Sequence, residues 1–126
     1  MNKEMIAEAV SIITERLLTP VIYYLDYGYK ADFVCFFEID VEEEEIYKTE
    51  EAITEKTGVA SQVVDIREFE PFDAADIVSD GELVYSENST MEGMFRAAIM
   101  TELQLRSAQK EIFIERKNVT NTLYIQ

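Results

Sequence analysis

The densest group of chemically active side chains is the acidic run formed by Asp40 and Glu42 to Glu45. Carboxylates at alternate positions are typical of calcium loops, and a 12-residue frame starting at Asp40 has acids at its positions 1, 3, 5 and 12. Position 6 of such a loop requires glycine for a sharp turn, but Glu45 stands there. Acidic side chains also suit the positive end of a helix dipole. The run therefore predicts the first turn of a helix and not a metal site.

Other familiar catalytic groups are missing from the sequence. There is no histidine, which excludes histidine bases, histidine-containing triads and histidine-ligated zinc. Cys35 is the single cysteine, so the chain has neither an intrachain disulfide nor a cysteine zinc site. It lies in the apolar run FVCFFEI without a basic neighbour, which predicts a buried, inert thiol. The four glycines stand singly, so no glycine-rich phosphate loop is present.

Length and charge narrow the class of protein. With 126 residues, 48% of them hydrophobic, we expect one globular domain spanning residues 1–126. Eleven basic residues against 26 acidic ones give a net charge of -15, which argues against binding to nucleic acid or to an anionic membrane. No apolar run is long enough to span a bilayer, and the N-terminal sequence MNKEMIAEAV has no apolar core of a signal peptide. We therefore expect a cytoplasmic protein.

The elements that must position any site follow from apolar periodicity and from capping residues. Ile6, Val10 and Ile13 recur at helical spacing. Asp40 with Glu43, and Ser89 with Glu92, have the spacing of capping boxes. Gly58 and Gly81 are expected to end helices. We expect helices over residues 3–18, 40–58, 71–80 and 90–115, and strands over 21–25, 33–39, 62–66 and 82–85.

This order of elements predicts an α/β (α+β) domain: a small mixed sheet with helices packed on it and a long C-terminal helix. The strand over 33–39 is so apolar that both of its faces should be covered. The final residues, VTNTLYIQ, are compatible with a short strand or with a loose end.

The stretch from Val63 to about Lys117 resembles the back half of the minimal nucleotidyltransferases of the DNA polymerase β-like superfamily. The resemblance is carried by Val64-Asp65-Ile66-Arg67, Pro71, Gly81-Glu82-Leu83-Val84-Tyr85 and Phe95. In that family a Gly-Ser turn holds the nucleotide phosphates, and an Asp-x-Asp pair with a third acid grips two Mg²⁺ ions. The resemblance implies a nucleotidyltransferase-like fold over nearly the whole chain.

The positions that would carry the chemistry depart from the family pattern. Gly28 matches the glycine of the turn, but Tyr29 replaces the serine. Asp32 matches the first acid of the pair, but Val34 stands in the second place. If Asp65 is the later acid of the family's strand motif, the third catalytic acid falls on Gln62. We therefore expect no catalytic residue and no bound metal, and a vestigial nucleotide and metal site at Gly28, Asp32 and Asp65.

Three functions follow as hypotheses. The favoured one is a non-catalytic, nucleotidyltransferase-like protein that needs no cofactor and acts by protein–protein interaction. Since many of these small nucleotidyltransferases are antitoxins paired with HEPN-type ribonucleases, the resemblance implies an acidic antitoxin covering a basic site. The alternatives are a residual Mg²⁺-dependent nucleotidyltransferase, with an atypical site made of Asp32, Glu38, Asp40 and Asp65, and a nucleotide-binding sensor.

Self-association is expected in addition to a protein partner. Tyr23, Tyr24, Tyr27 and Tyr29 cluster around one turn, more densely than a small core requires. Tyrosine suits a contact surface because its ring packs while its hydroxyl stays hydrogen-bonded. The cluster therefore predicts a homodimer, and the sequence does not identify the partner or the pathway.

Overall fold

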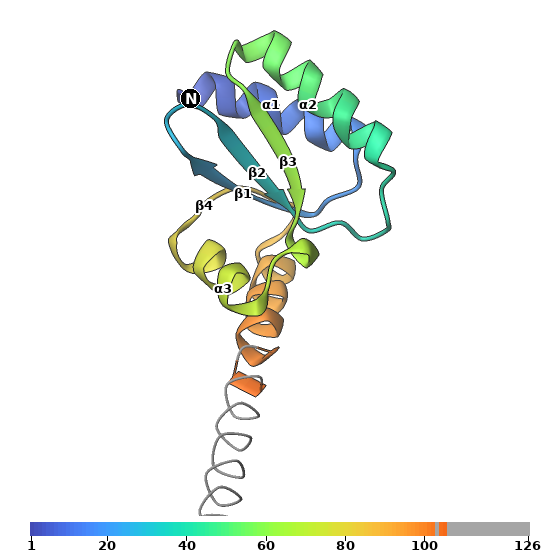
Figure 1. Ribbon diagram of the computed structural model, residues 1–126. Coiled ribbons are helices and arrows are strands. Elements are labelled where there is room, and N and C mark those ends of the chain that lie inside the picture. The colour runs from blue at the N-terminus through green and yellow to red at the C-terminus, as the bar shows by residue number, and fades with distance from the viewer. Residues whose placement is uncertain (103, 106–126) are drawn as a thin grey trace, which may run out of the picture.

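The computed structural model describes residues 1–102 and 104–105, and its centre is one four-stranded sheet (Figure 1). The strand order is β3-β2-β1-β4, with β2 parallel to β3 and the other two pairs antiparallel. The strands are β1 (Val21–Asp26), β2 (Ala31–Cys35), β3 (Ser61–Asp65) and β4 (Glu82–Ser86). The helices are α1 (Lys3–Arg16), α2 (Glu43–Thr57), the short η1 (Ile66–Glu68), α3 (Pro71–Asp80) and a last helix beginning at residue 89. The mixed sheet with packed helices confirms the predicted fold class.

Helices cover both faces of the sheet. In Figure 1, α1 and α2 lie on one side, and α3 with the start of the last helix lies on the other. The side chains of β1 and β2 alternate between these layers. Ile22, Tyr24 and Phe33 pack toward α1 and α2, whereas Tyr23 and Val34 pack toward α3 and the last helix. The two central strands are therefore apolar on both faces, and every residue of β2 is buried, as its composition predicts.

The strand predicted over 33–39 is the element whose boundaries differ most. β2 begins two residues earlier, at Ala31, and ends at Cys35. At this end of β2 the Phe36 amide donates to the Thr19 hydroxyl at 3.1 Å and to the Val21 carbonyl at 3.1 Å, and the Thr19 hydroxyl donates to the Val21 carbonyl at 2.8 Å. Phe36 and Phe37 remain buried outside the strand, which explains why hydrophobicity alone extended it.

Both predicted capping boxes are wrong in detail. α2 begins three residues after Asp40, its N-cap is Glu42, and no side chain caps it. Asp40 is instead engaged by Arg67, a partner that local spacing does not reveal. The last helix is capped by Asn88 and not by Ser89, because the Asn88 Oδ1 accepts from the Met91 amide at 2.7 Å.

The two helix ends predicted at Gly58 and Gly81 are confirmed. Gly58 follows α2 with a φ of 74°, a left-handed conformation that favours glycine. Gly81 ends α3 for a different reason: a Cβ atom there would lie 2.5 Å from the Ile77 carbonyl oxygen. Pro71 opens α3 as a proline at a first helical position should.

The last helix is fastened to the sheet by polar and aromatic contacts. The Tyr23 hydroxyl donates to the Glu92 carboxylate, and Arg96 binds both groups, at 3.3 Å and 3.1 Å respectively. Phe95 meets Phe36 edge-on, with 5.0 Å between ring centres. The predicted extension to residue 115 and the tail VTNTLYIQ lie outside the described residues.

Candidate functional site

The β1–β2 connection, where the family's phosphate-binding turn would lie, is a tight turn. Gly28 has a φ of 84°, and its amide donates to the Asp26 carboxylate at 2.8 Å. The Tyr27 amide donates to the Lys30 carbonyl at 3.0 Å, which closes the turn. Tyr27 and Tyr29 are exposed, and the Lys30 ammonium lies 5.1 Å from the centre of the Tyr27 ring. The turn therefore presents aromatic rings.

Asp32 is a buried carboxyl with an incomplete set of partners. The residue is 7% exposed, and its Oδ1 accepts no hydrogen bond from the described part of the chain. The Lys30 ammonium lies 3.7 Å from that oxygen and donates to Gln62 at 3.1 Å. Burial raises the pKa of Asp32 above its ordinary value, and Lys30 acts in the opposite direction. Position 32 is thus an unfavourable place for a negative charge.

The strand register places no second acid level with Asp32 on β1 or β3. Asp32 is level with Gln62 on β3 and with Leu25 on β1, while Val34 is level with Val64 and Tyr23. Alternate residues of a strand point the same way, so Asp32 and Val34 share a face. A second and a third acid on this face would have to stand at positions such as 34, 62 and 64, which are Val, Gln and Val.

Asp65 lies elsewhere, at the end of β3. It is level with Cys35, three positions along the strand from the pair formed by Asp32 and Gln62, and the odd offset puts it on the opposite face. Three residues correspond to about 10 Å along a strand. The structure therefore does not bring Asp32 and Asp65 together into one site.

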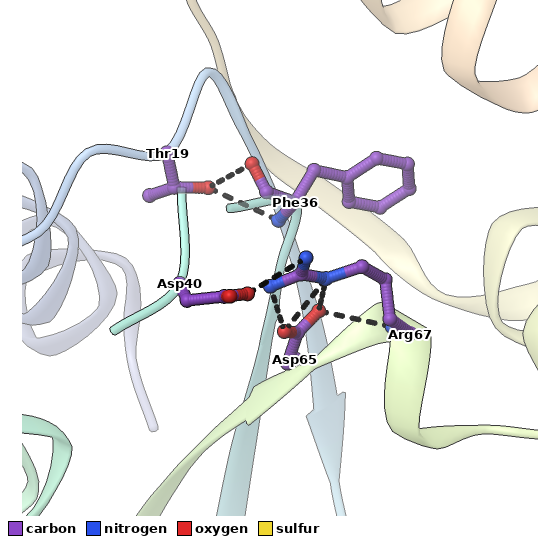
Figure 2. A network of polar contacts seen from close by, with 5 residues as sticks. All are labelled: Thr19, Phe36, Asp40, Asp65 and Arg67. Atoms are coloured by element: carbon purple, nitrogen blue, oxygen red, sulfur yellow. Dashed lines mark hydrogen bonds and ion pairs between the residues drawn. The ribbon is translucent and has the colours of Figure 1, made fainter. Parts of the chain in front are cut away.

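A guanidinium group occupies the position between two carboxylates at this end of the sheet (Figure 2). Arg67 donates to Asp65 from its Nε at 2.9 Å, its Nη2 at 2.7 Å and its backbone amide at 3.0 Å. Its Nη1 lies 3.2 Å from the Asp40 carboxylate. These acids raise the pKa of Arg67 further. Asp40 and Asp65 are thus neutralised by the chain itself, and they tie the loop after β2 to the end of β3.

The four acids considered above as an atypical metal site, Asp32, Glu38, Asp40 and Asp65, do not lie together. Asp40 and Asp65 meet at Arg67, Asp32 lies with Lys30, and Glu38 is exposed in the loop after β2. Within residues 1–102 and 104–105, no three acidic or cysteine side chains gather as metal ligands. Cys35 is fully buried, which raises the pKa of its thiol strongly, in agreement with the predicted inert cysteine.

An acidic groove runs along α2 beside β3, and the sequence analysis missed it. It has a volume of about 750 Å³ and is lined mainly by Tyr47, Glu50, Glu51, Thr54, Glu55 and Gln62. Glu50 accepts from the Val63 amide at 2.9 Å, and burial raises its pKa. The signal was available, because positions 47, 51 and 55 recur at helical spacing opposite the buried Thr49 and Ile53. α2 carries six glutamates and two lysines, so its net charge is -4.

The tyrosine cluster behind the predicted homodimer divides in two. Tyr23 and Tyr24 are 1% and 5% exposed and belong to the core, whereas Tyr27 and Tyr29 are 50% and 78% exposed. Tyr24 is buried in the core on the α1 side of the sheet. Its hydroxyl accepts a hydrogen bond from the N-terminal ammonium at 3.0 Å. Of the four tyrosines, only Tyr27 and Tyr29 are exposed enough to contact another chain.

Comparison with known proteins shows that the chain has a fold similar to those of several solved structures. No protein-family model matches the chain, and no curated protein does. Solved structures of toxin–antitoxin complexes do match. One is a tri-AMPylated Shewanella oneidensis HEPN toxin in complex with an MNT antitoxin, with a TM-score of 0.76 and 11% identity over 91% of this chain and 97% of that chain. Another is the MntA–HepT toxin–antitoxin, with a TM-score of 0.76 and 10% identity over 90% and 97%.

A toxin–antitoxin structure with AMP-PNP also matches, with a TM-score of 0.73 and 11% identity over 91% of this chain and 97% of that chain. The chain therefore has the fold of the minimal nucleotidyltransferase antitoxins, as its sequence resemblance implies. At such low identity the likeness establishes the fold, while function must be argued from the residues. In the described part of the chain, no helix is long and apolar enough to cross a membrane.

Proposed function

We propose that this chain is a non-catalytic, antitoxin-like protein that neutralises a basic partner protein by covering it. The observation that carries the proposal is the combination of a fold shared with antitoxins of toxin–antitoxin complexes and an acidic groove along α2. A surface of one charge steers an oppositely charged partner and favours the correct complex. We place this protein in the cytoplasm, where such a partner would be met.

Asp32 lacks the neighbouring acids that catalysis would require. Two-metal phosphoryl transfer needs several carboxylates around the ions, because the metals must bind both the nucleotide and the attacking group. Asp32 has no acidic neighbour at the level positions of β1 and β3 on its own face. Asp65 is held by Arg67 on the other face. Gly28 and Asp32 are thus proposed to be the remains of a nucleotide and metal site, and Asp65, on the opposite face, lies outside it.

A second candidate function is retained because of one observation. The orphaned Oδ1 of Asp32 is a buried acceptor that a nucleotide-bound cation would satisfy. A sensor that binds a nucleotide without turnover, or a weak residual transferase, would use that oxygen. Titration calorimetry with ATP and MgCl₂ separates the candidates. We expect no saturable heat, and saturable heat that Asp32→Asn abolishes would favour the second candidate.

Partner neutralisation is tested genetically. The genes flanking this one are expressed singly in a bacterial host, and any product that arrests growth is expressed again with this chain. We expect growth to recover with the native chain and to fail with the double variant Glu51→Lys/Glu55→Lys, because both exposed acids line the groove.

The matched control is Asp73→Lys/Asp76→Lys, which reverses two exposed acids on α3 and leaves the groove intact. Its rescue should equal that of the native chain. Equal loss of rescue in both double variants would show that total charge matters and the α2 groove does not.

The proposal also includes a homodimer, the unit in which we expect the protein to meet its partner.

A further inference from the structure

The last helix is attached to the domain by one of its faces. On that face, Phe95 and Ile99 pack against the buried cluster between the sheet and α3. Glu92 and Arg96 point to the same side, where both bind the Tyr23 hydroxyl of β1. Since successive residues of a helix turn by about 100°, the side chains at positions 94 and 98 point away from this attachment. The contacts with the domain therefore fix which face of the helix is turned outward.

The outward face carries a stripe of exposed, uncharged side chains. This exposed stripe consists of Met94, Ala98, Thr101 and Leu105, which follow one another at steps of four, three and four residues and so lie along one line of the helix. All four are exposed, and the two large ones, Met94 and Leu105, are 67% and 59% exposed. In Figure 1 the helix runs past α3 and away from the sheet. Two large apolar side chains thus face solvent on a firmly held helix.

The spacing of the exposed stripe is that of a coiled-coil seam. Alternating steps of four and three residues let the side chains of one helix fit into the gaps between those of another. In the sequence the same steps continue through Ala108 and Ile112, beyond the described residues. The small side chain of Ala98, between the larger Met94 and Leu105, leaves room for a second helix to approach closely. The stripe therefore fits a helix that carries the same spacing.

The distribution of charge favours a second copy as the occupant. Residues 1–88 contain 22 of the 26 acidic residues and six of the 11 basic ones, a net charge of -16, whereas residues 89–126 have a net charge of +1. Because charges beyond about 8 Å are screened at physiological salt, two copies repel each other least where these nearly neutral segments meet. A basic partner is drawn instead to α2, whose net charge is -4 and which lies on the other side of the sheet (Figure 1).

We propose that the exposed stripe of the last helix is the contact between two copies of this chain, which pair helix against helix along Met94, Ala98, Thr101 and Leu105. The inference rests on the homodimer of the proposed function and assigns its surface. The pairing leaves the acidic groove of each copy free for the partner, because α2 and the last helix lie on opposite sides of the sheet. It also needs no contact from the exposed tyrosines of the β1–β2 turn.

Sedimentation equilibrium of the full chain tests the assignment. The native protein should have the mass of two chains. Met94→Lys and Leu105→Lys should each weaken the dimer at least ~10-fold, equivalent to about 1.4 kcal/mol, because each places two lysines in an apolar seam. Lysine is a good helix former, so the helix itself should persist. Gln104→Lys is the matched control: it adds the same charge at the neighbouring exposed position, on a different face of the helix, and should leave the dimer unchanged.

Each outcome decides a different point. A native chain with the mass of one chain overturns the homodimer and this assignment, while the growth-rescue assay still decides partner neutralisation separately. A dimer that withstands both stripe variants, or that Gln104→Lys weakens equally, overturns the assignment alone, and so does a dimer that only Tyr29→Lys dissociates. A native monomer whose rescue of growth is lost in Leu105→Lys identifies the partner as the occupant of the stripe, which also overturns the assignment. Circular dichroism confirms that each variant is folded.

Discussion

At the scale of single residues, Asp32 is the buried acid whose surroundings decide what this face of the sheet can bind. Its carboxyl is buried beside Lys30 and level with Gln62, and nothing else on its face is acidic at the neighbouring strand positions. Asp40 and Asp65 show the opposite solution, because Arg67 supplies their counter-charge within the chain. The Asp32 carboxylate is buried and has one ammonium 3.7 Å away, whereas the Asp65 carboxylate accepts two hydrogen bonds from one guanidinium, which is the stronger compensation for a negative charge.

The buried carboxyl predicts a specific pH dependence of stability. Burial raises the folded-state pKa of Asp32 above 3.8, so as pH rises the unfolded chain releases this proton first. The native protein therefore loses stability as pH climbs from the ordinary value to the raised one, and it carries that loss at neutral pH.

Asp32→Asn removes this ionisation. Urea unfolding should find the variant more stable than the native chain at pH 7, on the order of 1 kcal/mol, with the difference vanishing under acid conditions where both side chains are neutral. Glu51→Gln, an exposed carboxyl of α2, is the control and should leave the pH profile unchanged. A variant that is less stable at pH 7 would show that Lys30 compensates the buried charge fully.

At the scale of elements, helix attachment depends on contacts between distant parts of the chain. The last helix is bound to β1 through the Tyr23 hydroxyl, Glu92 and Arg96. Glu92 is largely buried, with a side chain that is 16% exposed, so its partners matter more than those of a surface acid. The helix should loosen before the sheet does when this network is broken.

Tyr23→Phe tests that attachment. The change keeps the ring that contacts Phe36 and removes only the hydroxyl. We expect a loss of roughly 1–2 kcal/mol in the free energy of unfolding. Hydrogen exchange should quicken first in residues 89–102. Tyr27→Phe, at an exposed turn, serves as the control. Uniform quickening over all strands would contradict a role confined to the last helix.

Elements were predictable where their signals are local. The strand predicted over 21–25, the helix end at Gly58 and the proline that opens α3 each depend on their own backbone, and the structure confirms all three. Asp40 failed as a cap because Arg67, far along the chain, competes for its carboxylate. The strand after the turn ends at Cys35, earlier than its hydrophobicity predicts, because Phe36 and Phe37 are buried by tertiary packing beyond the end of β2. Such outcomes depend on tertiary contacts that periodicity does not contain.

At the scale of the whole molecule, the sheet separates two kinds of surface. An acidic groove along α2 lies beside the β3 edge, and an apolar groove between α1 and β4 lies at the other edge. The valine at position 34, where the resembled family has its second acid, can be read from the sequence, and the fold that the resemblance implies agrees with the fold comparison. The contact of Arg67 with Asp40 and the hydrogen bond of Glu50 to the Val63 amide cannot be read from the sequence, because they join segments that only the tertiary fold brings together.

The most direct test of the account compares two variants in the same growth-rescue assay. Asp32→Asn removes the one acid left on its face of the sheet, and Glu51→Lys/Glu55→Lys removes the acidic groove without touching Asp32. If the protein acts by covering a basic partner, Asp32→Asn rescues growth as well as the native chain, and the double variant does not. Loss of rescue in Asp32→Asn, with rescue retained in the double variant, would contradict the account and restore a role for nucleotide chemistry at Asp32.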